Sequence, residues 1–97
     1  MQDLTLQHFA EHLNTHFTVG TEHGDTAFTL LEAQPLSTPL LEGMTRSPFS
    51  LLFHNPSQVL FPQGIYRMSH PDTGDVEIFL VPVARREQGF VYQAVFN

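Results

Sequence analysis

The segment "QGIYRMSHPDTGDVEIFLVPV", residues 63–83, decides the fold predicted from this sequence. Two runs, residues 63–69 and 75–83, have the two-residue period and the β-branched and aromatic side chains that are typical of strands. Between them lies the turn "PDTG", in which Pro71 presets the first turn dihedral and Gly74 takes the left-handed position. The segment therefore predicts a β-hairpin.

Similar runs on both sides of this hairpin predict four more strands, at residues 16–20, 26–33, 48–54 and 90–96. Residues 34–48 contain three prolines and a glycine, so we expect a connection whose apolar side chains fold back over an end of the sheet. Runs that are apolar on both faces, such as "VEIFLVPV", indicate a sheet that curls or is covered.

The N-terminal stretch "LTLQHFAEHLNTHF", residues 4–17, changes the period to that of a helix. Thr5 is the expected N-cap, Leu4 and Phe9 have the spacing of a hydrophobic staple, and the helix is predicted over residues 5–15. We therefore predict a single α+β domain over residues 1–97, in which one N-terminal helix packs on a strongly bent, mostly antiparallel sheet or small barrel of about six strands.

The composition excludes several classes of function. The chain has no cysteine and no lysine, which removes disulfides, thiol catalysis, thiolate zinc sites and Schiff-base lysines. A net charge of −6 disfavours binding to nucleic acid and to anionic membranes. The N-terminal residues lack the pattern of a secretory signal, and no apolar run reaches the ~20 residues that span a bilayer. We expect a cytoplasmic protein that does not contact nucleic acid or membrane.

Three histidines, His8, His12 and His16, follow one another at a spacing of four and form what we call the histidine stripe. Neighbouring members lie one helical turn apart and have the spacing to share an ion, but eight residues rise about 12 Å, so all three cannot bind one metal. The segment "HLNTH" lacks the Glu of a zinc-protease motif. Our interpretation is that these rings flank the apolar face of the helix; a weak two-histidine metal site is the alternative.

The tripeptide "DTG" at residues 72–74 matches the active loop of aspartic proteases, but here it lies inside a Pro-Asp-x-Gly hairpin turn. The chain has no nucleophile-elbow pattern and no Ca²⁺-loop spacing. We therefore predict that the protein is not an enzyme and needs no cofactor.

The stretches "SPFSLLFHNP", "FPQGIYRMSH", "DVEIFLVPV" and "GFVYQAVFN" resemble a bacterial family of domains of about this length and of unknown function. Its members share a central "pFsLlF", then "PQGiY", "FLvPv" and a C-terminal "Y.AvFN". The resemblance covers nearly the whole chain and implies the extent of the domain, but no activity. It also implies, more weakly, an accessory role in phage-tail-like or similar assemblies.

Our leading hypothesis is a non-enzymatic binding or structural accessory module of a bacterial or phage-tail-like assembly, with a protein partner or self-association. Alternation favours a core role for Tyr66, Tyr92 and Phe96, and the functional alternative is an exposed patch that binds the partner. Arg85 and Arg86 are candidates for contact with an anionic partner. The second hypothesis is a small ligand- or metal-binding protein that uses the sheet interior or the histidine stripe.

Overall fold

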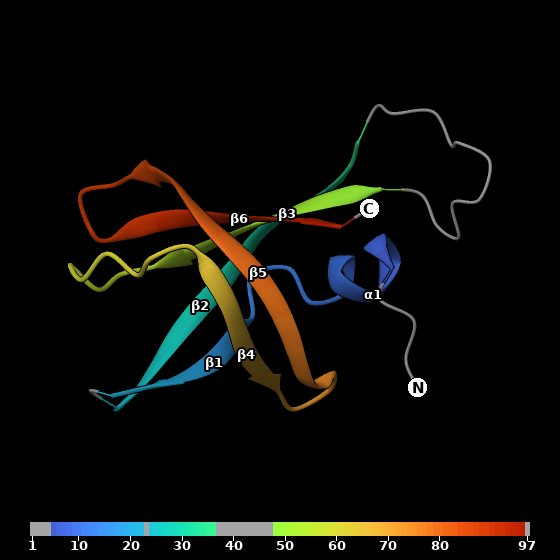
Figure 1. Cartoon of the computed structure of the whole chain (residues 1–97). Helices are drawn as coiled ribbons and strands as arrows, with labels where there is room; N and C mark the ends of the chain where they lie inside the picture. The colour runs from blue at the N-terminus through green and yellow to red at the C-terminus, as the bar shows by residue number, and fades with distance from the viewer. Residues whose placement is uncertain (1–4, 23, 37–47, 97) are drawn as a thin grey trace.

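The structure is a computed structural model, which describes residues 5–22, 24–36 and 48–96. Strands make up 64% of these residues and helix 6%. The elements in chain order are α1 (Leu6–Ala10), β1 (His16–Thr21), β2 (Gly24–Pro35), β3 (Phe49–Asn55), β4 (Gly64–His70), β5 (Gly74–Arg85) and β6 (Phe90–Phe96). The described part of the chain is therefore nearly all β (Figure 1).

The strands form a closed barrel in the order β1-β2-β3-β6-β5-β4, and every neighbouring pair is antiparallel. Pairing of β1 with β4, through Thr18 with Ser69 and Val19 with Met68, closes the circle. Figure 1 shows β4 and β5 crossing in front of the other strands, with α1 at one end of the barrel. The predicted α+β class is wrong: the described residues form a closed six-stranded antiparallel barrel, not a helix packed on a sheet.

The helix is too short to define a layer of the fold. It begins as expected, with the Thr5 side chain accepting a hydrogen bond from the His8 N–H at 3.2 Å, but it ends at Ala10 rather than near residue 15. Asn14 has a left-handed backbone with φ 65°, and its N–H donates to the Leu30 carbonyl oxygen at 2.7 Å. Hydrogen bonding to β2 therefore ends the helical segment, although the apolar period alone favours its continuation.

Two predicted features lie outside the described residues. One is the hydrophobic staple, because Leu4, its first residue, is not described. The other is the 34–48 connection, of which residues 37–47 are not described.

The core fills the barrel interior, because alternate side chains of each strand point inward. Phe9 closes the end of the barrel beside α1, with ring centroids 6.5 Å from Phe17, 6.0 Å from Phe49 and 5.5 Å from Phe96. The buried apolar residues are Phe9, Phe17, Val19, Phe28, Leu30, Phe49, Leu51, Phe53, Met68, Val76, Ile78, Leu80, Val91, Tyr92 and Ala94.

The two longest strands, β2 and β5, bend enough to follow the barrel. The register shifts between Leu30 and Glu32 in β2 and between Pro82 and Ala84 in β5. Such bulges add an unpaired residue and increase the local twist, and Pro82 has no N–H to donate to the ladder. The bulges therefore supply curvature that an uninterrupted pairing of 12-residue strands lacks.

A buried amide fixes the chain where β3 ends. The Asn55 side chain is 1% exposed, donates to the Thr26 hydroxyl at 2.9 Å and accepts from the Ser57 N–H at 2.8 Å. Gly89, in the turn before β6, lies so close that a Cβ there would be 1.7 Å from the Asn55 carbonyl oxygen. This contact leaves room for glycine alone at position 89.

Candidate functional site

Three side chains with metal-ligating atoms meet beside α1: His12, His70 and Asp72. Their ligand atoms all lie within 4.8 Å of one another. His12 lies in the turn after α1, His70 is the last residue of β4, and Asp72 lies in the turn to β5. The β1–β4 pairing that closes the barrel brings the segment before β1 to the end of β4. We call these three residues the His–His–Asp cluster.

Hydrogen bonds fix the protonation state of His70 within this cluster. The Asp72 backbone N–H donates to His70 Nδ1 at 3.0 Å, so Nδ1 carries a lone pair. The other ring nitrogen, Nε2, lies 3.0 Å from the Thr15 hydroxyl, which itself donates to the His12 carbonyl oxygen at 2.5 Å. Because the Thr15 hydroxyl already donates its proton to His12, Nε2–H must be the donor to the Thr15 oxygen. With a proton on Nε2 and none on Nδ1, the His70 ring is neutral.

The surroundings of His70 favour the same neutral state. Burial lowers the pKa of His70, the neighbouring His12 lowers this pKa further, and the Asp72 carboxylate opposes both. The His70 ring packs against two other rings, with centroids 4.6 Å from His12 and 4.7 Å from Phe17. An uncharged imidazole with a fixed orientation is a suitable metal ligand.

The histidine stripe predicted from sequence is divided by the structure. His8 packs edge to face on His12 with ring centroids 6.2 Å apart, and its buried Nε2 has no hydrogen-bond partner among the described residues. His16 instead begins β1 and is exposed, and its Nδ1 lies 2.9 Å from the Thr29 hydroxyl. The helix ends before His12, so helical spacing does not place His16 near the other two.

Sequence reasoning missed His70 and Asp72 as partners of His12. Their spacing of two in "SHPDTGD" was visible, but we interpreted that segment as a turn. Its proximity to His12 depends on the β1–β4 pairing, which no local pattern reveals.

The aromatic residues Tyr66, Tyr92 and Phe96, for which a partner surface was the alternative to a core role, are buried or half-buried. Tyr92 is fully buried, and its hydroxyl accepts a hydrogen bond from the Phe61 N–H at 3.0 Å, which agrees with the core role favoured by the alternation. Phe96 is half-buried and stacks on Phe49 with ring centroids 4.7 Å apart. Tyr66 is half-buried too, and its hydroxyl donates to the Pro62 carbonyl oxygen. The three side chains therefore do not form the exposed patch that was the alternative to a core role.

The two arginines named as candidates for an anionic partner are exposed. Arg85 is the last residue of β5, and Arg86 follows it in the turn to β6. The Arg86 backbone N–H donates to the Gly89 carbonyl oxygen at 3.0 Å, which holds the turn. Both positions are open to a partner, but no described contact assigns them one.

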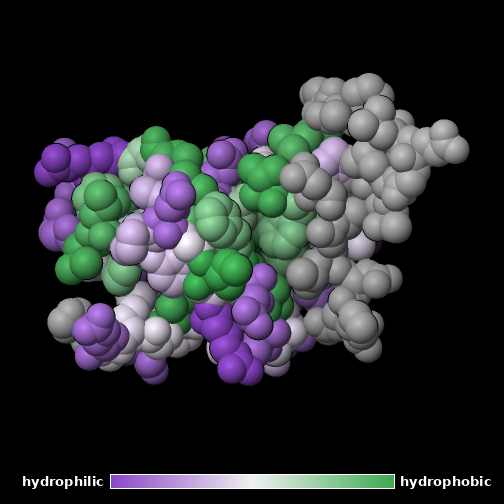
Figure 2. Space-filling view, in the orientation of Figure 1, coloured by the Kyte–Doolittle hydropathy of each residue, from purple (hydrophilic) through white to green (hydrophobic). Residues whose placement is uncertain are grey.

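An apolar surface that the sequence reasoning did not identify lies on the outside of the barrel. Ile65 of β4 pairs with Phe79 of β5, and these residues are 68% and 51% exposed. Val95 of the neighbouring strand β6 is 48% exposed too, although the pairing of β5 with β6 ends at Val81 and Gln93. We call the paired residues Ile65 and Phe79 the wall patch. Figure 2 shows apolar side chains gathered on this face, over β5 and the strands beside it.

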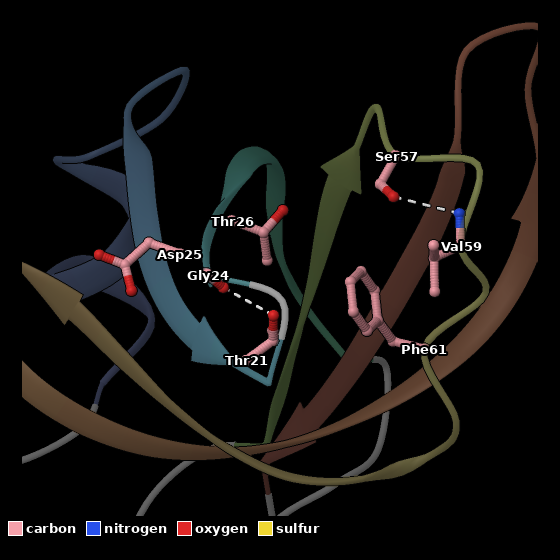
Figure 3. A pocket seen from close by; sticks show the side chains of 7 residues that line it. All are labelled: Thr21, Gly24, Asp25, Thr26, Ser57, Val59 and Phe61. Carbon is pink, nitrogen blue, oxygen red and sulfur yellow. Dashed lines mark hydrogen bonds between the residues drawn. The ribbon is translucent and has the colours of Figure 1, made fainter.

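A pocket of about 210 Å³ lies at the end of the barrel away from α1, between the β1–β2 turn and the 57–61 segment. Figure 3 shows the seven residues that line it, with the Asp25 carboxylate pointing away from the others. The Thr21 hydroxyl donates to the Gly24 carbonyl oxygen at 2.6 Å, and Ser57 accepts from the Val59 N–H at 3.1 Å. These polar groups stabilise local turns, and the described lining contains no convergent acid–base pair.

The described residues define a small closed antiparallel β-barrel with the His–His–Asp cluster at one end and the wall patch on its outer face. The chain belongs to the family described as domain of unknown function DUF6916, whose model matches residues 4–96. This match confirms the predicted resemblance to a family of domains of unknown function. No curated protein and no solved structure matches the chain. Among the described residues, no helix has the length and apolar character to cross a membrane.

Proposed function

We propose that the protein is a non-enzymatic binding module that holds a protein partner against the wall patch. The observation that carries this proposal is the exposure of Ile65 and Phe79, which pair across two neighbouring strands and both face away from the core. The inward side chains already fill the barrel, so packing of the barrel gives no reason for an aromatic ring on its outer face. Adjacent exposed apolar side chains of this kind mark interaction surfaces.

The polar residues next to the wall patch also support an interface. Arg67 and Glu77 pair on β4 and β5, two positions along from Ile65 and Phe79. The Arg67 guanidinium lies 3.3 Å from the Asp75 carboxylate, and all of these side chains are exposed. A charged rim beside an apolar centre is the usual arrangement of a protein interface, in which the centre supplies affinity and the rim supplies orientation.

The partner that fits this surface is a second copy of the chain or a component of a larger assembly. The family resemblance implies a bacterial or phage-tail-like assembly, and the proposal retains the cytoplasmic setting predicted from the sequence. In either case the wall patch is the contact, so one substitution there tests both forms of the proposal.

The test compares Phe79→Ser with the control Val59→Ser. The two side chains have similar exposure, 51% for Phe79 and 54% for Val59, but Val59 lies in the 57–61 segment at the barrel end. Light scattering over a range of concentrations measures self-association. Affinity capture from the native host, followed by mass spectrometry, measures partner retention. Circular dichroism checks that both variants fold.

We expect the wild-type chain and Val59→Ser to dimerise or to retain the same partner, and Phe79→Ser to lose that association by at least about tenfold in affinity, because central aromatic contacts contribute about 2 kcal/mol or more. Equal behaviour of the two variants would contradict the proposal. A wild-type chain that stays monomeric and retains no partner would contradict it as well.

A further inference from the structure

We propose that the His–His–Asp cluster binds one divalent transition-metal ion and that zinc is the ion it fits best. This inference is independent of the wall patch and of the partner proposed for it. It also differs from the histidine stripe considered from sequence, because it replaces His8 and His16 with His70 and Asp72.

The distances within the cluster are close to those of a metal site. His12 Nδ1 lies 4.0 Å from Asp72 Oδ2, and all three ligand atoms lie within 4.8 Å of one another. In a tetrahedral zinc site with bonds of about 2.0–2.1 Å, ligand atoms are about 3.3 Å apart. The ligand atoms must therefore approach one another by up to about 1.5 Å, through rotation of the exposed Asp72 carboxylate and of the His12 side chain, which lies in a turn.

The three ligands differ in mobility in a way that suits metal entry. The Asp72 side chain is 72% exposed and is free to rotate, whereas the His12 side chain is 16% exposed and His70 is buried. The two imidazoles thus form the less exposed inner part of the site, and the carboxylate approaches from solvent. A metal ion reaches the cluster from the Asp72 side without opening of the barrel.

The hydrogen bonds of His70 prepare one ring nitrogen for a metal. Its Nε2–H donates to Thr15, which fixes the ring orientation and the tautomer with the lone pair on Nδ1. Metal-binding histidines usually donate their second ring nitrogen to a protein acceptor in this way. The ion would replace the Asp72 N–H as the partner of Nδ1, which places it beside the Asp72 carboxylate.

The donor set selects the class of ion. Two imidazoles and one carboxylate favour zinc, nickel, cobalt or copper over magnesium and calcium, which prefer sites made of oxygen alone. Three protein ligands leave a fourth tetrahedral position for water. His8 is close to His12, but its ring nitrogens do not belong to the group of mutually close ligand atoms, so we leave it out of the site.

The experiment uses the untagged full-length chain after removal of metal with a chelator. Calorimetric titration with zinc chloride measures stoichiometry and affinity, and the visible absorption of cobalt(II) reports whether coordination is tetrahedral. The variants His12→Gln and Asp72→Asn remove one ligand each. Their matched controls are His16→Gln and Asp75→Asn, which change a nearby histidine and an aspartate of the same hairpin without touching the cluster.

We expect one zinc ion per chain, and a loss of affinity of more than about tenfold in His12→Gln and Asp72→Asn, because even residues behind the ligands contribute that much. The controls should bind as the wild type does. Because His70 is buried, its replacement endangers folding. The NMR chemical shifts of its ring nitrogens, measured in the wild-type chain before and after addition of zinc, therefore test whether His70 binds the metal.

Three results would overturn the proposal. The first is an absence of zinc binding by the wild-type chain. The second is an equal loss of affinity in the cluster variants and their controls, which would indicate nonspecific binding by surface histidines. The third is zinc binding that leaves the His70 ring nitrogens unchanged.

Discussion

Replacement of Phe9 by Ala should destabilise the barrel strongly, because this side chain closes the interior at the α1 end. Phe9 is 0% exposed and contacts the rings of Phe17, Phe49 and Phe96. Buried Phe→Ala substitutions cost about 3–5 kcal/mol from lost transfer free energy and from the cavity that remains. Phe96 is only half-buried at this end, so partial collapse of the cavity should keep the loss near the lower value, about 3 kcal/mol.

A domain of this size loses roughly 4–8 °C of Tm for each kcal/mol, so Phe9→Ala should unfold about 12–24 °C below the wild type. Urea and thermal denaturation followed by circular dichroism measure both quantities. Phe9→Leu should cost less, about 1–2 kcal/mol, because most of the volume is kept. Leu13→Ala provides a control at a side chain that is 39% exposed. A cost below about 1 kcal/mol for Phe9→Ala would refute the role of Phe9 in closing the barrel.

Two further predictions concern the packing around β6. Gly89→Ala should lower the free energy of unfolding by more than about 2 kcal/mol in urea denaturation, because a Cβ at φ +84° would lie 1.7 Å from the Asn55 carbonyl oxygen. The control is Gly64→Ala, where a Cβ would meet no atom within 4 Å and the free energy of unfolding should change far less. Equal effects of the two substitutions would contradict this account. Burial raises the pKa of Tyr92 from 10.0, only partly offset by the hydrogen bond from Phe61. The unfolded chain therefore ionises first, and stability that is fully present below pH 10 should fall as the pH rises through the raised pKa. Tyr92→Phe should flatten that fall in denaturation curves at alkaline pH, and an unchanged slope would show that another group causes it.

Local patterns predicted much of the strand structure correctly. The turn at residues 71–74 joins β4 to β5 as the sequence indicated, with Ser69 paired to Asp75 across the hairpin. The predicted strands at 16–20 and 90–96 coincide with β1 and β6 to within a residue. These predictions depend on side-chain period and turn chemistry, which act over a few residues and can therefore be recognised in a single sequence.

The candidate sites were predicted far less well. Tyr92, for which a partner surface was the alternative to a core role, is buried, whereas Ile65 and Phe79, which were not predicted to lie at a surface, are exposed. The run "VEIFLVPV" is apolar at both alternating sets of positions, so its period does not state which set faces the core. Register with the neighbouring strands decides that choice.

The sequence by itself determined the hairpins, the start of the helix at Thr5 and membership of the family. Only the tertiary structure decided the closure of the barrel, the early end of the helix and the meeting of His12 with His70. All three depend on hydrogen bonds between distant segments, such as Asn14 with Leu30 and β1 with β4. Each of these contacts needs a partner that is distant in sequence, and a local pattern does not specify which one. The β-barrel and the His–His–Asp cluster therefore form only when the whole chain folds.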